Sequence, residues 1–231
     1  MKIVLLFLPL FVLAKIQTEQ IILVTTLSWS TNTGTMKRYE KINNRWQQIG
    51  KEKQVFLGKN GLAWGIGKHL PKKHNLKKEG DKKSPAGIFT LPLFYSYNPI
   101  KASFPHTISK EYYHCVDDSN SNYYNSVINA KKVQRDYKSY EAMKFPQNYY
   151  KYALAINHNY FNSAQSIPKR GSCIFFHISP APTVGCTALP NEQDMKELVL
   201  WLNKKKNPIL IQAPKSEIKE LLQETTFMQA K

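Results

Sequence analysis

The chain has 231 residues, a formal net charge of +17 at pH 7 and 42% hydrophobic residues. This length suits one domain with a hydrophobic core of normal size, which excludes a mini-protein that depends on stapling bonds. The positive charge favours anionic partners in principle, but the lysines are scattered in pairs and triples, so we interpret it mainly as a soluble basic surface.

The first 14 residues have the features of a secretory signal peptide. Met1 and Lys2 give a positive start, residues 3–13 form an almost unbroken apolar run, and Ala14 completes a small-residue cleavage site. A membrane anchor is the alternative, but the run is shorter than the roughly 20 residues that span a bilayer. We therefore expect a periplasmic or secreted protein with no membrane span after cleavage, and no nucleic-acid partner.

Short β-branched and apolar runs separated by turn residues predict a mainly β (α+β) fold, either a sandwich or a barrel. The N-terminal half is expected to contain a strand at 21–28, a turn at 31–34, a hairpin over 36–49 with Asn43 and Asn44 at its tip, a strand at 55–57 and a turn at 58–61. A basic, exposed loop is expected over 68–78.

The second half contains an insertion followed by the most regular elements. Residues 95–152 are rich in Tyr, Asn and Ser, and a short helix is expected at 139–143. Beyond the insertion we expect buried strands at 152–157 and 172–178, an amphipathic helix at 191–205 and a last strand at 208–213. Residues 15–214 are thus predicted to form one domain, and residues 215–231 a loosely attached tail with helical character.

Three cysteines remain to be explained, and in an exported protein an odd number leaves at least one thiol free. Cys173 lies in an apolar strand run, where burial would make it inert. The pairing of Cys115 stays open. Because there is no Cys-x-x-Cys motif or metal-ligand spacing of histidines, no metal and no cofactor are expected. The remaining histidines are interpreted as surface or loop residues: His69, His74, His106, His114 and His158.

One segment carries a possible nucleophile. His177 ends a predicted buried strand, and Cys186 follows nine positions later, after a proline-rich connection. Acyl transfer by a thiol needs a base and backbone amides that face the developing oxyanion. Gly185 can offer such an amide, and Thr183 can brace the turn. The spacing alone also fits a small buried cysteine and a hydrogen-bonded core histidine.

The segment from His177 to Cys186 resembles the active-site signature of the YkuD-type L,D-transpeptidases, in which a His precedes a Ser/Thr-x-Gly-Cys sequence. Residues 79–89 resemble the family's acidic-Gly and Ser/Thr-Pro-Ala-Gly-x-Phe element. The Gly-Ser-x-Ile-Phe-x-His run at 171–177, together with Asp117-Asp118 and Tyr124-Asn125, resembles a divergent bacterial branch. The similarity extends over about residues 55–211.

Two positions depart from the family pattern. Val184 stands where many members have a second His, and Ala188 stands where many have an Arg. One proton partner and one contact to a substrate carboxylate are therefore missing, and His177 would act as the only imidazole.

The resemblance implies an exported cysteine acyltransferase that acts on peptidoglycan stem peptides through a thioester. The expected catalytic residues are Cys186 as nucleophile, His177 as base and acid, Gly185 as oxyanion amide and Thr183 as turn residue. Substrate contacts are expected from Asp118, Asn125 and Thr187, although turn capping is the commoner use of Asp-Asp-Ser. An L,D-carboxypeptidase of the same fold and a non-catalytic cell-wall-binding module are the alternatives, and the oligomeric state is left open.

Overall fold

Residues 15–229 of the protein are described by a computed structural model. The predicted signal peptide, residues 1–14, lies outside the described residues. The fold is mainly β, as predicted, and consists of a large mixed sheet, a small antiparallel sheet and two α-helices within the described range.

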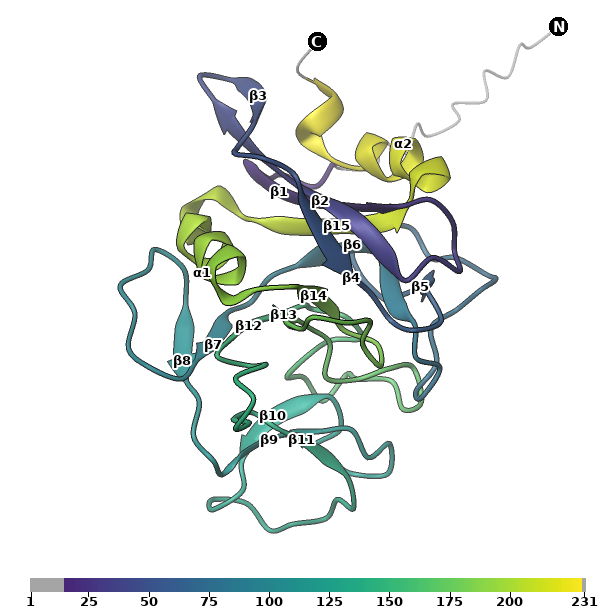
Figure 1. Cartoon of the computed structure of the whole chain (residues 1–231). Helices are drawn as coiled ribbons and strands as arrows, with labels where there is room; N and C mark the ends of the chain where they lie inside the picture. Colours follow the sequence, from purple (N-terminus) through teal and green to yellow (C-terminus); the bar gives the residue numbers. More distant parts are fainter. Residues whose placement is uncertain (1–14, 230–231) are drawn as a thin grey trace, which may run out of the picture.

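Twelve strands form the large sheet, in the order β5-β6-β15-β1-β2-β4-β14-β13-β12-β7-β8, with β3 paired to β2. These strands are β1 (Gln20–Thr26), β2 (Thr33–Ile42), β3 (Arg45–Gln48), β4 (Lys53–Phe56), β5 (Leu62–Trp64), β6 (Ser84–Thr90), β7 (Phe94–Ser96), β8 (His106–Ile108), β12 (Tyr152–Ala155), β13 (Phe175–Ile178), β14 (Thr187–Leu189) and β15 (Ile209–Pro214). Figure 1 shows β1, β2, β15 and β6 in an upper layer, above β14, β13, β12 and β7. One hydrophobic core draws residues from both layers.

The hairpin predicted near the N-terminus is confirmed. Asn43 and Asn44 have φ angles of 49° and 61°, the left-handed conformation that a two-residue hairpin turn requires and that Asn tolerates. The turn predicted at 31–34 is wrong, because Thr33 and Gly34 already belong to β2. Gly34 lies so close to β1 that a Cβ atom would come 2.7 Å from the Thr25 carbonyl oxygen. In the sequence a glycine at this position suggests a turn. In the structure its missing side chain allows β1 and β2 to pack closely.

The amphipathic helix is confirmed as α1 (Glu192–Trp201), which is shorter than expected and is followed by a 3-10 turn, η1 (Lys204–Lys206). Asn191 caps it, since its side chain accepts a hydrogen bond of 2.9 Å from the Asp194 N–H. Its buried face consists of Met195, Leu198 and Val199. This face closes one side of the core next to β12, β13 and β14.

The C-terminal tail is helical, as predicted, but it is not loosely attached. It consists of α2 (Lys215–Gln223) and a 3-10 turn, η2 (Thr226–Gln229). Leu221 is fully buried, and Thr225 pairs with Ile16. Figure 1 shows α2 over the upper layer, next to β1 and β15. Within residues 15–229, no helix has the length and apolar character needed to cross a membrane.

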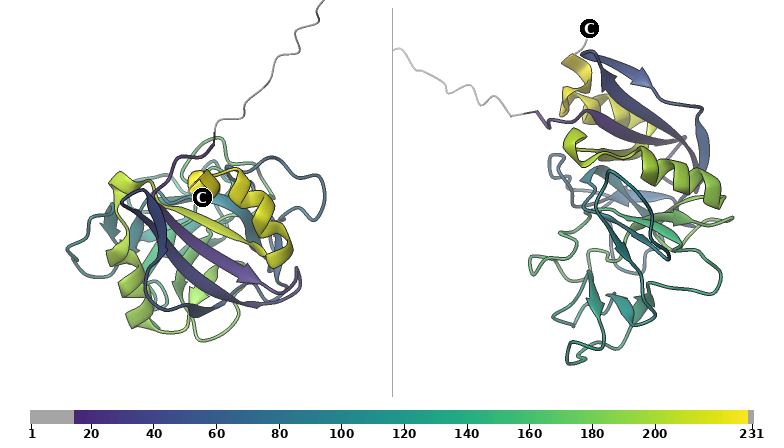
Figure 2. Two further views of the ribbon diagram at one scale, coloured as in Figure 1. Left: turned by 90° about the horizontal axis from the view of Figure 1, so that it is seen from above. Right: turned by 90° about the vertical axis from the view of Figure 1, so that its left-hand side faces the viewer.

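The inserted region forms a separate antiparallel sheet of β9 (Tyr113–Val116), β10 (Ser126–Asn129) and β11 (Tyr140–Ala142). The helix expected at 139–143 is wrong, because residues 140–142 pair with β9 as a strand. The right-hand view of Figure 2 places this sheet at the opposite end of the molecule from α2.

A disulfide joins the small sheet to the large one. It links Cys115 of β9 to Cys173, which precedes β13, with 5.9 Å between the Cα atoms. Cys173 was expected to be inert through burial in a strand; it is buried, but it precedes β13, which begins at Phe175, and it is bonded to Cys115, whose pairing had been left open. The disulfide therefore holds the insertion against the strand that leads to His177.

Candidate active site

Cys186 lies directly before β14 and is the free thiol among residues 15–229. It lines a pocket of about 220 Å³ between the two sheets. The pocket wall is made of the loop before β6, the insertion, the residues before β13 and the turn before Cys186, and it includes Lys77, Glu79, Gly80, Lys82, Asp117, Glu141, Ser172, Cys173, Ile174, Val184 and Gly185. The sheets thus place the predicted nucleophile at a concave site.

The turn before Cys186 is held by side-chain hydroxyl groups. Thr183 Oγ1 donates to the Cys186 carbonyl at 2.5 Å and accepts from the Gly185 N–H at 3.1 Å. Ser84 Oγ donates to the same carbonyl at 2.7 Å. Gly185 has a φ angle of 153°, which favours glycine. Since Thr183 takes the Gly185 amide, the expected oxyanion donor is engaged in this state, and the Cys186 amide is the backbone donor next to the thiol.

The thiol is buried and polarised by backbone groups. The Phe175 N–H donates to Cys186 Sγ at 3.3 Å, and Sγ lies 3.4 Å from the Cys173 carbonyl, to which its proton can be donated. Burial, reinforced by the negative charge of Glu141, raises the pKa of Cys186 to about 12. The sulfur is therefore a neutral thiol at pH 7 in this conformation.

His177 lies on β13, which pairs in parallel with β14, the strand that begins directly after Cys186. Its Nδ1–H donates to the Ile178 carbonyl at 2.9 Å, and its ring packs on Tyr150 with 5.0 Å between centroids. Burial lowers the pKa of His177 to about 4, so the ring is neutral at pH 7 with Nε2 as its basic atom. Within the described chain His177 does not hydrogen-bond to Cys186, nor does it line the pocket.

The three residues expected to contact substrate lie away from the pocket lining. Asp118 caps a loop, because its carboxylate accepts from the Asn120 and Lys138 amides at 3.0 and 2.8 Å. Asn125 is buried and hydrogen-bonds to three backbone groups. Thr187 is buried and donates to Gln212 at 2.8 Å.

Two acidic residues from the insertion line the pocket: Glu141, which the sequence analysis missed, and Asp117, which it named beside Asp118 but did not place at the site. Glu141, on β11, accepts a hydrogen bond from the Tyr150 hydroxyl, and burial raises the pKa of its carboxyl to about 7. Asp117 Oδ1 is buried without a hydrogen-bond partner among the described residues. Both come from the insertion, and the sequence offered no spacing that could connect them to a cysteine 45 or more residues away.

The loop before β6 supplies a buried cation. Lys77, expected in an exposed basic loop, is only 2% exposed. Its Nζ donates to Asp81 Oδ1 at 2.6 Å and to the Lys78 carbonyl at 3.0 Å. Asp81 and Glu79 both lie in the segment at 79–89 that carries part of the resemblance. Asp81 does organise the loop, whereas Glu79 accepts from Tyr124 and Ser172 at 2.5 and 2.7 Å on the pocket wall.

Two of the histidines interpreted as surface or loop residues lie in loops but are buried. His158 accepts from the Ile66 amide at 3.1 Å and contacts the Arg170 carbonyl at 2.9 Å, and burial lowers its pKa to about 3. His69 accepts from the Ile88 amide at 3.1 Å, and burial lowers its pKa to about 4. They were missed because neither lies in an apolar run that would have signalled burial.

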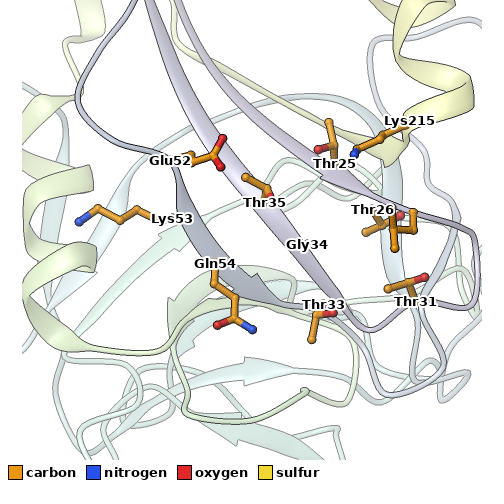
Figure 3. Close-up of a pocket in the computed structure, with 11 residues that line it drawn as sticks. Thr25, Thr26, Thr31, Thr33, Gly34, Thr35, Glu52, Lys53, Gln54 and Lys215 are labelled. Atoms are coloured by element: carbon orange, nitrogen blue, oxygen red, sulfur yellow. The ribbon is translucent and has the colours of Figure 1, made fainter.

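A different pocket, of about 470 Å³, lies on the outer side of β2 and β4 and is shown in Figure 3. Its lining is rich in threonine, including Thr25, Thr33 and Thr35, and contains no cysteine or histidine. Across the described range, no group of three or more His, Cys, Asp or Glu side chains is arranged to hold a metal ion. The pocket at Cys186 is therefore the candidate for chemistry.

Comparison with family models identifies the family of this chain. The family model of the L,D-transpeptidase catalytic domain (YkuD) matches residues 33–211. The crystal structure of the helical cell shape determining protein Pgp2 from Campylobacter jejuni aligns with a TM-score of 0.40 and 15% identity, over 87% of this chain and 50% of that chain. This chain thus spans half of that structure. A comparison with curated protein sequences finds no match. Because the family model covers most of the chain, the protein belongs to the YkuD L,D-transpeptidase catalytic domain family.

Proposed function

We propose that this protein is a cell-envelope cysteine acyltransferase that acts on peptidoglycan stem peptides as an L,D-transpeptidase. The observation that carries the proposal is the position of Cys186: a free thiol in a pocket, next to a hydroxyl-braced turn, with His177 on the adjacent strand. Membership of the family supports the substrate class.

In the proposed first step, Cys186 Sγ attacks the carbonyl carbon of an L,D-linked amide in the stem peptide. The thiol proton passes to Nε2 of His177, and the Cys186 amide faces the oxyanion. The C–N bond then breaks, the leaving nitrogen of the D-residue takes the proton from His177, and a thioester remains. Since thiol and imidazole are both neutral in this conformation, bound substrate must bring the two groups into contact before the proton moves.

In the second step an acceptor amine attacks the thioester carbonyl. A new amide bond forms, the C–S bond breaks, and Sγ regains a proton. Attack by water instead of the amine gives a free carboxylate, which is the carboxypeptidase outcome.

Location in the periplasm or outside the cell is part of the proposal. The disulfide between Cys115 and Cys173 supports it, because such bonds persist in oxidising compartments and are rare in the cytosol. The predicted signal peptide over residues 1–14 would provide the route.

The test is a digest of purified muropeptides analysed by mass spectrometry. The wild-type protein should release the terminal D-residue of tetrapeptide stems and form crosslinked dimers, and Cys186→Ala should form neither product while unfolding at the same temperature. Release without dimers would replace the proposal with the carboxypeptidase. If the folded wild-type protein yields no product and gains no covalent mass from a carbapenem, the proposed function is wrong. The non-catalytic cell-wall-binding module would then replace it.

A further inference from the structure

Glu141 is a half-buried residue of the Cys186 pocket, and the proposed first step does not use its desolvated carboxyl group. It lies on β11 of the insertion and lines the same pocket as the thiol. Its Oε2 accepts a hydrogen bond from the Tyr150 hydroxyl. The ring of Tyr150 packs on both Phe175, at 5.3 Å, and His177, at 5.0 Å between centroids. The carboxylate is thus fixed in place next to the proposed nucleophile.

A buried carboxylate that serves only the fold is normally paired with a cation. None of the ion pairs within residues 15–229 includes Glu141. Lys77 lines the same pocket, but its ammonium group is bound to Asp81. Asp117, on the same wall, also has a buried oxygen without a partner. The pocket therefore holds acidic oxygen atoms that the fold does not neutralise.

The second half of the reaction needs a base that can reach the acceptor. An acceptor amine must lose a proton as it attacks the thioester, and the base must lie at the pocket where the acyl group is held. His177 does not line this pocket in the described chain, whereas Glu141 does. Acceptor and carboxylate can meet there without a movement of the β13 strand.

We propose that Glu141 is a second catalytic residue, the general base that deprotonates the acceptor attacking the Cys186 thioester. This inference rests on the proposed function. The acceptor nitrogen forms its bond to the acyl carbon while its proton passes to the Glu141 carboxylate. The C–S bond then breaks, and the thiolate takes the proton back from Glu141, so that both groups return to their starting state.

The charged surroundings of Glu141 set the pH at which it can act. Burial raises the pKa of Glu141 to about 7, the Tyr150 hydrogen bond lowers it, and the negative charges of Asp117 and Glu79 raise it. Lys77 also lines the pocket, as does the Cys186 thiol. Because the base must be ionised, turnover should rise as the pH increases through about 7. If His177 were the base, its pKa of about 4 would place this rise in turnover, the acidic limb of the pH profile, at a much lower pH.

The experiment compares full-length wild-type protein with Glu141→Gln, Tyr150→Phe and the matched control Glu111→Gln. Glu111 lies in the same insertion, but its side chain is exposed and paired only with Lys144. For each protein we would measure the rate of covalent acylation by a carbapenem, the steady-state turnover of muropeptides from pH 5 to 9, and the unfolding temperature.

The Glu141→Gln variant should be acylated by the carbapenem at least as fast as wild type, because a negative charge near the sulfur is removed. Its turnover of muropeptides should fall about 100-fold, and the rise in turnover near pH 7 should disappear. Tyr150→Phe keeps the ring and should shift that limb to higher pH. Glu111→Gln should match wild type. Equal losses of acylation and turnover in Glu141→Gln, or an unmoved limb in Tyr150→Phe, would overturn the inference. A wild-type protein that is never acylated and yields no product would overturn the proposed function, and this inference with it.

Discussion

Reduction of the Cys115–Cys173 disulfide should strongly destabilise the protein. The bond closes a loop of 58 residues. A cross-link of this span removes about 14 cal/mol/K of chain entropy from the unfolded state, or about 4 kcal/mol at 25 °C. Both cysteines are buried, and the bond is the covalent tie between the insertion and the large sheet in the described chain. We therefore expect the free energy of unfolding to fall by about 4 kcal/mol on reduction.

The assay is urea unfolding followed by tryptophan fluorescence, with and without dithiothreitol. Cys186→Ala serves as the control, because Cys186 is not part of the bond and its variant should lose the same stability on reduction. Thiol titration in denaturant gives an independent check: one reactive thiol without reductant and three with it. Three thiols without reductant, or a loss below about 1 kcal/mol, would refute the reasoning.

Three further predictions concern individual side chains. Asn125→Ala should cost about 3 kcal/mol in urea unfolding, because it leaves three buried backbone groups without partners; an unchanged midpoint would contradict this. Thr183→Val should lower the rate of acylation by a carbapenem about 10-fold or more with little change in unfolding temperature, because it removes the two hydrogen bonds that hold the turn before Cys186. An acylation rate equal to that of wild type would show that these hydrogen bonds do not position the thiol. His158 has a pKa lowered to about 3, so the stability it contributes is complete above pH 6.5 and is lost as the pH falls toward 3. Between pH 7 and 4, thermal unfolding of His158→Gln should therefore depend less on pH than that of wild type, and parallel curves would exclude the linkage.

Local patterns in the sequence were sufficient for elements whose signals lie within a few residues. The Asn43-Asn44 turn, the amphipathic helix α1 and the helical character of the C-terminal segment follow from backbone preferences and periodicity, which operate over one or two turns of chain. The thiol and the strand-end histidine were also visible, because the motif from His177 to Cys186 is contiguous.

Contacts between distant segments decided the rest. The segment at 139–143 becomes a strand because β9 pairs with it, and Cys115 finds Cys173 across 58 positions. The protonation of the site depends on the same contacts: burial by the insertion leaves Cys186 as a thiol, His177 neutral and the pKa of Glu141 near 7. Desolvation and charge interactions depend on distance in space, whereas a single sequence records only distance along the chain. The sequence by itself therefore pointed to Cys186 as the candidate nucleophile, and the tertiary structure decided which acids, cations and carbonyl groups surround its thiol.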